Sequence, residues 1–410
     1  MSSHVIAGPI AGKPYEMPSN VKMVSIGMLV VGLALLGYGT TTEAWRVWSA
    51  GLIASYYFVS IAIGAGVVLA LINVTKAGWG VVVRRIPEAI TGYLPFGLLT
   101  MLAVTYFGLS DLYEWSHADI VAKDELLQHK AALLNVGGFF MRMVFIIGGW
   151  AFFTMMLRKK SRQQDADGKV EHSASGLVWG VLFLIFFGLS ITFGALDWLM
   201  SLEPHWFSTM FGVYQFAGAH VAGCAMIALL AVHLKKGGFL PNVNENHLHD
   251  LGKMMFAFST FWGYIWVCQY LLIWYANIPE ETGYYVIRNN NGWFALFALN
   301  VVLNFIVPFF GMMPRPNKRN PKWLLAIGSA VLTGHFLDVY LQVSPATAFF
   351  HAHLAGEHGA PAGPQFGLTE IGGFLAVAGL FMFVVHTMLT KAPLLPVNDP
   401  YLQESLNHNQ

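Results

Sequence analysis

Long apolar blocks separated by short polar stretches dominate the chain, and each block is about as long as a bilayer is thick. A helix needs roughly 20 residues, at about 1.5 Å each, to cross the hydrocarbon core. Stretches such as GLVWGVLFLIFFGLSITFGA are apolar on every face, unlike the alternating strands of a membrane β-barrel. The pattern therefore predicts ten transmembrane helices, near residues 22–39, 50–74, 89–110, 131–157, 176–199, 207–234, 251–277, 292–314, 322–343 and 366–390.

Composition agrees with this all-α polytopic membrane fold. Hydrophobic residues make up 56% of the chain and charged residues only 11%, against about 25% charged residues in an average soluble domain. The net charge is only +1, and the basic residues are scattered along the chain and do not cluster in one domain. We therefore expect contact with membrane lipid and no nucleic-acid binding. The longest polar stretches have about twenty residues, which leaves no room for a soluble domain.

The distribution of Lys and Arg predicts the orientation of the helices, because basic loops resist translocation. One set of alternate loops, together with both terminal segments, carries eighteen of the 23 basic residues. The opposite loops carry only Arg46, Lys123, Lys130 and Arg288. The sequence therefore predicts that both termini are cytoplasmic, and that the loops with few basic residues lie on the outer side.

Hydropathy also divides the chain into parts. Residues 1–49 form an N-terminal tail and the first helix, and 344–410 form an outer loop, the tenth helix and a tail. The eight helices between them divide into two four-helix bundles, 50–199 and 207–343, as expected from an internal duplication. The small residues of IAIGAG (61–66) should allow close helix contact.

Resident redox or metal centres are not expected. The two cysteines, Cys224 and Cys268, are too few for an iron-sulfur cluster or a zinc site, and the sequence has no CxxCH motif. His220 and His335 differ in depth by about 7 Å, a poor match for the two axial ligands of one haem. Three histidines of the 344–365 segment, His351, His353 and His358, could ligate a metal, but an ordinary solvated loop is favoured.

Ionisable residues inside the spans are costly unless they are paired or hydrated, and they mark candidate functional positions. His335 and Asp338 lie three apart on one helix, which brings them to one face as a proton relay or, equally, as a packed pair that fixes a tautomer. Arg142 should seek a carboxylate or the carbonyl groups at a helix end. The residues proposed for a proton path are Arg142, His220, His335 and Asp338 as central stations, with Glu370 and Glu203 as outer exits.

A second candidate is the stretch DWLMSLEPHWFSTMFGVYQF (197–216), which covers one helix end, an outer turn and the next helix start. A quinol site needs a proton acceptor and an aromatic-lined slot. The candidates for such a site are Asp197, Trp198, His205, Trp206 and Tyr214. The alternative is an aromatic and acidic turn that anchors the protein at the membrane interface.

This stretch, preceded by SITFGALDWLM, resembles the NrfD-like (polysulfide reductase membrane subunit) family, in particular the second NrfD-like subunit, the F subunit, of bacterial alternative complex III. The resemblance covers nearly the whole chain. It implies a subunit of a respiratory quinol:cytochrome c (or high-potential iron-sulfur protein) oxidoreductase in the bacterial inner, or cytoplasmic, membrane.

The resemblance also implies partners. These are a sister NrfD-like subunit, an outer-side iron-sulfur subunit, multihaem cytochrome c subunits and, as a further candidate, a terminal oxidase. Haem and iron-sulfur clusters belong to these partners, and this chain has no redox centre of its own; quinol is its candidate ligand. Two other roles stay open, a structural membrane anchor with the quinol site in the sister subunit, and a non-redox transporter.

Overall fold

A computed structural model describes residues 14–290, 292–356 and 363–409, and in this part of the chain the secondary structure is helical. Ten helices or runs of helix are long and apolar enough to cross a membrane, which confirms the predicted all-α polytopic fold. The spans are α1 (Ser19–Gly39), α2 (Ala44–Val74), α3 to α4 (Arg85–Phe107), α8 (Val136–Asp167), α9 with η4 (Glu171–Leu202), α10 (Phe211–Lys236), α11 (Glu245–Ala276), α13 to α14 (Trp293–Met312), α16 (Pro321–Leu354) and α17 (Leu368–Leu389).

Two of the spans are irregular. The third consists of α3 (Arg85–Ile90), the 3₁₀ turn η2 (Thr91–Tyr93) and α4 (Leu94–Phe107). The eighth consists of α13 (Trp293–Val301), a π-helical turn η5 (Val302–Ile306) and α14 (Val307–Met312). Single π-helical turns inside α-helices occur frequently at functional sites.

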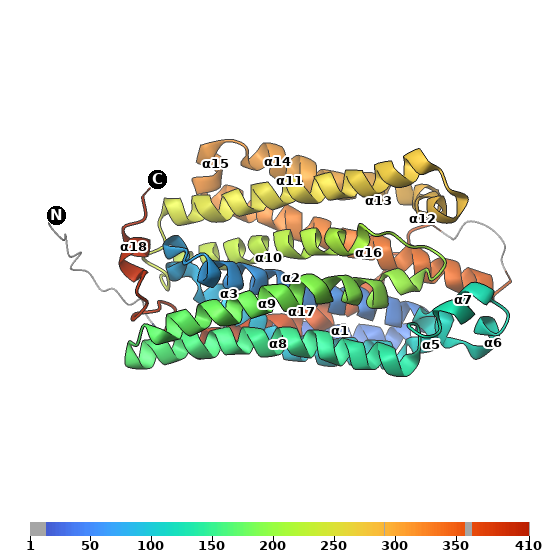
Figure 1. Ribbon diagram of the computed structural model, residues 1–410, viewed down its shortest axis with the longest axis horizontal. Coiled ribbons are helices and arrows are strands. Elements are labelled where there is room, and N and C mark those ends of the chain that lie inside the picture. The colour runs from blue at the N-terminus through green and yellow to red at the C-terminus, as the bar shows by residue number, and fades with distance from the viewer. Residues whose placement is uncertain (1–13, 291, 357–362, 410) are drawn as a thin grey trace.

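The short helices lie at the two ends of the bundle (Figure 1). We call the end with α5, α6, α7 and α12 the loop end, and the end with α18 the terminal end. The loop end contains α5 (Leu109–Leu112), η3 (Glu114–Ser116), α6 (Ala118–Val121), α7 (Glu125–Lys130), η4 (Met200–Leu202) and α12 (Pro279–Asn289), and the terminal end contains η1 (Gly78–Val83), α15 (Arg315–Arg319) and α18 (Leu402–Leu406).

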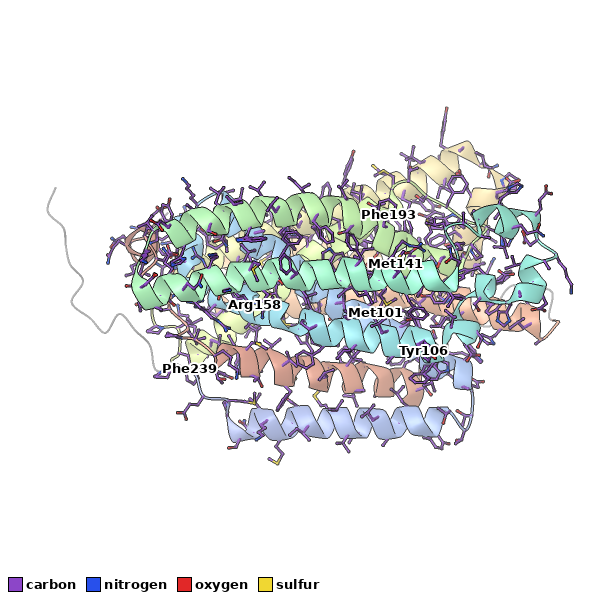
Figure 2. All side chains as sticks on the ribbon, turned by 60° about the horizontal axis from the view of Figure 1, so that its bottom comes forward. Met101, Tyr106, Met141, Arg158, Phe193 and Phe239 are labelled. Atoms are coloured by element: carbon purple, nitrogen blue, oxygen red, sulfur yellow. The ribbon has the colours of Figure 1, made fainter. Side chains whose placement is uncertain are left out.

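Helices α2 and α10, the first helices of the two predicted bundles, pack against each other at the centre of the molecule. Their backbones touch where a Cβ added at Gly64 would overlap the carbonyl group of Ala219, and one added at Gly223 would meet the backbone of Gly64. Both helices are buried over most of their length. The close contact predicted for the IAIGAG segment is therefore present. Helix α1 packs on α17 at the edge of the bundle, also through glycines such as Gly32 (Figure 2).

Outward-facing side chains of the spans are apolar, as expected for a lipid-exposed surface. Tyr106, Met141 and Phe193, on α4, α8 and α9, are 65, 69 and 53% exposed (Figure 2). In water such a surface would be unstable, because it would expose a large apolar area. Lipid removes that cost, so this surface needs no protein cover.

One predicted loop is partly helical. The segment 344–365 was expected to be an outer loop, but α16 continues through Pro345 to Leu354. The expectation is therefore wrong for residues 344–354. The reason is tertiary, because a side chain from another helix bonds the carbonyl group that Pro345 leaves without its helical donor, as described below.

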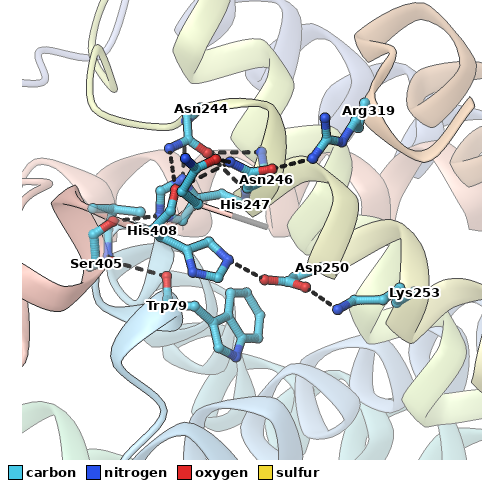
Figure 3. A network of polar contacts seen from close by, with 11 residues as sticks. Trp79, Asn244, Asn246, His247, Asp250, Lys253, Arg319, Ser405 and His408 are labelled. Atoms are coloured by element: carbon cyan, nitrogen blue, oxygen red, sulfur yellow. Dashed lines mark hydrogen bonds and ion pairs between the residues drawn. The ribbon is translucent and has the colours of Figure 1, made fainter. Parts of the chain in front are cut away.

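The C-terminal segment is fixed to the terminal end by a polar network (Figure 3). Asp250 on α11 accepts a hydrogen bond from His408 at 2.6 Å, and His247 bonds the carbonyl oxygen of Ser405 at 3.0 Å. Ser405 in turn donates to the carbonyl of Trp79 at 3.0 Å. These contacts hold α18 against the start of α11 and the η1 turn.

Candidate functional site

Three buried polar residues of α16 lie on one helical stripe in the membrane. His335, Asp338 and Gln342 are 2, 3 and 4% exposed, and their spacing of three and four residues places them on the same face. A Cβ added at Gly218 on α10 would lie 3.2 Å from His335 Nδ1 and 3.8 Å from an Asp338 carboxylate oxygen. The two side chains therefore share a face, as their spacing predicts, and Gly218 leaves room between them.

Asp338 is held by donors from two other helices. The hydroxyl group of Tyr214 on α10 donates to Oδ1, and Nδ2 of Asn300 on α13 donates to the same oxygen at 2.8 Å. Asn304, in the π-helical turn, donates to Oδ1 of Asn300 at 2.6 Å. The irregular eighth span thus directs two amide side chains toward this carboxylate.

His335 has one bonded nitrogen and one free nitrogen. Its Nε2 lies 2.7 Å from the hydroxyl oxygen of Ser60 on α2, and its ring lies 5.5 Å from the ring of Tyr57. Within the described residues, Nδ1 has no hydrogen-bond partner. This nitrogen lies next to Gly218, on the side of the ring where Asp338 also lies.

Amide side chains continue the polar contacts toward the loop end. Nε2 of Gln215 donates to Oε1 of Gln342 at 2.5 Å, and the hydroxyl group of Tyr56 donates to Oε1 of Gln215 at 3.0 Å. All three side chains are buried. Unpaired amides are costly in an apolar interior, so these mutual bonds are what makes the cluster stable there.

Arg288 of α12 joins this cluster to the loop end of the bundle. It is 1% exposed, and its guanidinium group lies 2.6 Å from Glu203 and 3.4 Å from the ring centre of Tyr284. Burial lowers its pKa, but Glu203, Tyr284 and Tyr285 together raise it more, so the pKa of Arg288 lies above its ordinary value. Arg288 is therefore a permanent buried cation at the loop end.

The same guanidinium group replaces a backbone hydrogen bond that is missing from α16. Pro345 has no N–H group, so the carbonyl of Leu341 lacks its usual helical donor. Nε of Arg288 donates to that carbonyl at 2.8 Å, and Nη2 donates to the carbonyl of Gln342 at 3.1 Å. Arg288 thereby ties α12 to α16 and allows the helix to continue through the proline.

We call these residues the polar column. Its members are His335, Asp338, Tyr214, Asn300, Asn304, Gln342, Gln215, Tyr56, Arg288 and Glu203. It extends from the middle of α16 to the loop end of the bundle.

A cavity of about 370 Å³, which we call the outer cavity after the predicted orientation, lies where the polar column reaches the loop end. Trp206 and Tyr284 form one wall, with ring centres 4.1 Å apart and nearly parallel planes. Glu203 and His205 also line the cavity, and His205 is bonded to Asp124 at 2.6 Å. The other polar lining residues are Glu114, Glu280 and His353. The cavity therefore combines aromatic walls with several groups that can exchange protons.

The structure distributes the candidate residues over several places. Trp198 is fully buried against Trp150. Arg142 forms a two-bond ion pair with Asp197, at 2.5 and 3.0 Å, so Arg142 has the carboxylate partner expected for it. Neither Asp197 nor Trp198 lines the cavity at Glu203. Tyr214, expected in an aromatic slot, bonds Asp338 instead.

Glu370 and His220 also lie apart from the polar column. Glu370 is bonded to Arg46 at 3.0 and 2.8 Å, and it caps the start of α17 through the N–H group of Gly367. His220 is fully buried, and neither ring nitrogen has a partner within the described residues. It lines a separate apolar cavity of about 320 Å³ that includes Phe187 and Phe258.

Metal ligation finds no support in the described residues, where no group of three or more His, Cys, Asp and Glu side chains could hold a metal ion. His351 and His353 lie in α16, and Nε2 of His351 donates to the carbonyl of Asp111 at 2.9 Å. His358 lies outside the described residues.

Several members of the polar column were missed from the sequence, namely Gln215, Gln342, Asn300, Asn304, Tyr56 and Arg288. The available signal was the presence of amide side chains inside apolar spans, where an uncharged polar group is also costly. A prediction based only on ionisable residues in the spans does not include these amide side chains. Arg288 was counted with the outer loops, because only the tertiary structure shows that α12 folds back onto α16.

The fold and the site define an α-helical polytopic membrane protein with a buried polar column that ends in a cavity at the loop end. No model of a known protein family matches the chain, and a search of curated protein sequences finds no match either.

Proposed function

We propose that this chain is an integral membrane subunit of a quinol:cytochrome c oxidoreductase of the alternative complex III type, and that its polar column carries protons to the outer face. The observation that carries the proton role is the arrangement of His335, Asp338, Tyr214 and Glu203 in one polar column within a bundle of apolar helices. Ionisable groups at membrane depth commonly mark ion or proton pathways.

The assignment to a complex draws on the resemblance of the 190–216 region to the NrfD-like family. In the proposed assembly the outer-side iron-sulfur subunit and the multihaem cytochromes hold the redox centres, and a sister NrfD-like subunit lies beside this chain. A terminal oxidase is a further proposed partner. We place both termini in the bacterial cytoplasm, since the terminal end carries most of the basic residues.

Within the polar column, Asp338 and His335 have complementary roles. Asp338 accepts hydrogen bonds from Tyr214 and Asn300, which orient its carboxylate, and the free Nδ1 of His335 lies on the same side of α16. A proton can pass between groups that share a face directly or through one water. Glu203, which lies next to the outer cavity and is paired with Arg288, is then the release group.

The test uses Asp338→Asn in the intact complex reconstituted into proteoliposomes. We expect quinol-driven reduction of the electron acceptor to persist, while the number of protons released per electron falls. Asp250→Asn is the matched control, because Asp250 is equally buried at the terminal end and lies outside the polar column. Equal proton stoichiometry in wild type and Asp338→Asn would exclude the proton role.

Quinol binding at the outer cavity is the second candidate function. The stacked rings of Trp206 and Tyr284, with His205 and Glu203 beside them, are the specific observation that favours it. His205→Ala should then slow quinol oxidation and raise the quinol concentration needed for half the maximal rate. His129→Ala is the control, since His129 is a strongly exposed histidine of the same end. Unchanged kinetics in His205→Ala would leave the quinol site to the sister subunit.

The structural-anchor and transporter alternatives are separated by purification. A redox subunit or an anchor should copurify with haem and iron-sulfur proteins from native membranes, whereas a transporter should transport its substrate when purified alone. An anchor further predicts that Asp338→Asn leaves the number of protons released per electron unchanged and that His205→Ala leaves the rate of quinol oxidation unchanged.

A further inference from the structure

The terminal end carries a second polar cavity, of about 480 Å³, that the polar column does not use. Its lining comes from one stripe of α8 and from the end of α17, and comprises Met155, Arg158, Lys159, Arg162, Gln163, Ala166 and Met388. The α8 residues are spaced by three or four positions, so they face the cavity together. Figure 2 shows Arg158 on α8, in the half of the bundle that also carries Phe239.

The three cations of this cavity have no acidic partner among the described residues. No carboxylate lies within ion-pair distance of Arg158, Lys159 or Arg162 in that part of the chain. Moreover, the Nε atoms of Arg158 and Arg162 and the Oε1 atom of Gln163 are buried without hydrogen-bond partners. A buried guanidinium N–H group without an acceptor is costly, which points to a ligand that supplies one.

Neighbouring cations show that this lack of acidic partners is local. Arg84 pairs with Asp399, and Arg85 pairs with Glu88 at 2.5 Å and also with Asp165. Glu88 attracts Arg158 electrostatically, but its ion pair is with Arg85. Asp399, Glu88 and Asp165 are therefore each paired with Arg84 or Arg85, and none of them forms an ion pair with the cations of the α8 stripe.

The position of the cavity and the order of its lining residues along α8 indicate the kind of ligand that would fit it. Met155 and Met388 lie at its apolar side, and the cations continue along α8, which rises about 16 Å between Met155 and Ala166. Gly92 leaves room for the side chains of Arg158 and Met388. A Cβ at this position would lie 2.9 Å from Nη1 of Arg158 and would overlap Met388. A ligand here meets cations at one end and apolar side chains at the other, like a phospholipid at the edge of the bilayer.

We propose that this cavity binds the phosphodiester headgroup of an anionic phospholipid. Arg158 and Arg162 donate to the phosphate oxygens, Lys159 adds charge, and the amide group of Gln163 bonds a hydroxyl group of the headgroup. The methionines contact the first part of the acyl chains. Basic pockets between transmembrane helices on the cytoplasmic side are suited to such headgroups.

The experiment places the purified full chain in nanodiscs of phosphatidylcholine with increasing phosphatidylglycerol, and follows thermal unfolding by tryptophan fluorescence. We expect phosphatidylglycerol to raise the unfolding temperature of the wild type. In Arg158→Gln with Arg162→Gln the apparent lipid affinity should fall about thirtyfold, since each cation near the headgroup contributes about a fivefold effect.

The matched control is Lys160→Gln with Lys169→Gln, which removes the same charge from the same end but leaves the cavity lining intact. Control and wild type should respond alike to phosphatidylglycerol. Equal responses of the cavity variant and the wild type would overturn the proposal. A wild type stabilised equally by inorganic phosphate in pure phosphatidylcholine would also overturn it, in favour of a soluble anion. Loss of an acidic partner protein from the cavity variant, with no lipid effect, would assign the cavity to a protein interface.

Discussion

The hydrogen bond from Arg288 to the carbonyl of Leu341, which Pro345 leaves without a helical donor, gives a prediction with a defined energy. In Arg288→Gln, the carboxylate of Glu203 loses its cation, the carbonyl of Leu341 loses its donor, and the carbonyl of Gln342 loses an additional donor. Breaking a buried ion pair by removing one partner costs about 3 to 5 kcal/mol. Arg288→Gln should therefore lower the free energy of unfolding by at least about 3 kcal/mol.

A second substitution isolates the part that belongs to Pro345. In Pro345→Ala the new N–H group can bond the carbonyl of Leu341, so that this carbonyl no longer depends on Arg288. The double variant should then be more stable than the sum of the single effects by about 1 kcal/mol, the typical net value of one hydrogen bond.

The assay is reversible unfolding in mixed micelles with increasing SDS, for the wild type, the two single variants and the double variant. Arg142→Gln combined with Pro345→Ala serves as the control cycle, because Arg142 bonds Asp197 and Leu133 and shares no partner with Pro345. That pair should be additive. Additivity within about 0.5 kcal/mol for Arg288 and Pro345 as well would refute the role assigned to the guanidinium group.

Three further predictions concern packing, pH and the ion pair of the first bundle. Gly64→Ala should destabilise the protein in the SDS assay by about 1 to 3 kcal/mol, because the new methyl group overlaps the backbone of α10, whereas Gly188→Ala, with open space around it, should be nearly neutral. Asp124 accepts the backbone N–H of Leu127, which lowers its pKa, so its stabilising effect is full above its unfolded pKa of about 3.9 and is lost as the pH falls through the folded value. Asp124→Asn should therefore lower the thermal stability more at pH 7 than at pH 2.5, and an equal difference at both values would contradict this. Arg142→Gln should destabilise the protein more than Arg142→Gln combined with Asp197→Leu, because the single change leaves a buried carboxylate unpaired. The single variant should therefore have the lower unfolding midpoint in the SDS assay, and the opposite order would contradict the prediction.

The membrane architecture could be predicted from the sequence because it depends on local hydropathy. Ten apolar blocks of sufficient length predict ten spans whatever their mutual arrangement, and the described structure contains them. The spacing of His335 and Asp338 likewise places both on one face, since helical periodicity is a local property. The need of Arg142 for a carboxylate or for the carbonyl groups at a helix end also follows from its depth alone.

Tertiary structure alone decided which polar groups meet. Asp197 pairs with Arg142, 55 positions earlier, and Tyr214 turns to Asp338, 124 positions later, although both had been assigned to one aromatic site. Such pairings depend on how each helix is rotated and on which neighbour it packs against, and hydropathy carries no information about either.

The same division explains α16 and the polar column. The sequence predicts an outer loop after 343 because proline and polar residues begin there, but Arg288 supplies the donor that Pro345 removes and the helix continues to Leu354. The sequence by itself determined the solvent of each segment, lipid or water. Only the folded chain determined the partners of each polar group, because a partner is set by three-dimensional distance and not by the burial preference of a single residue.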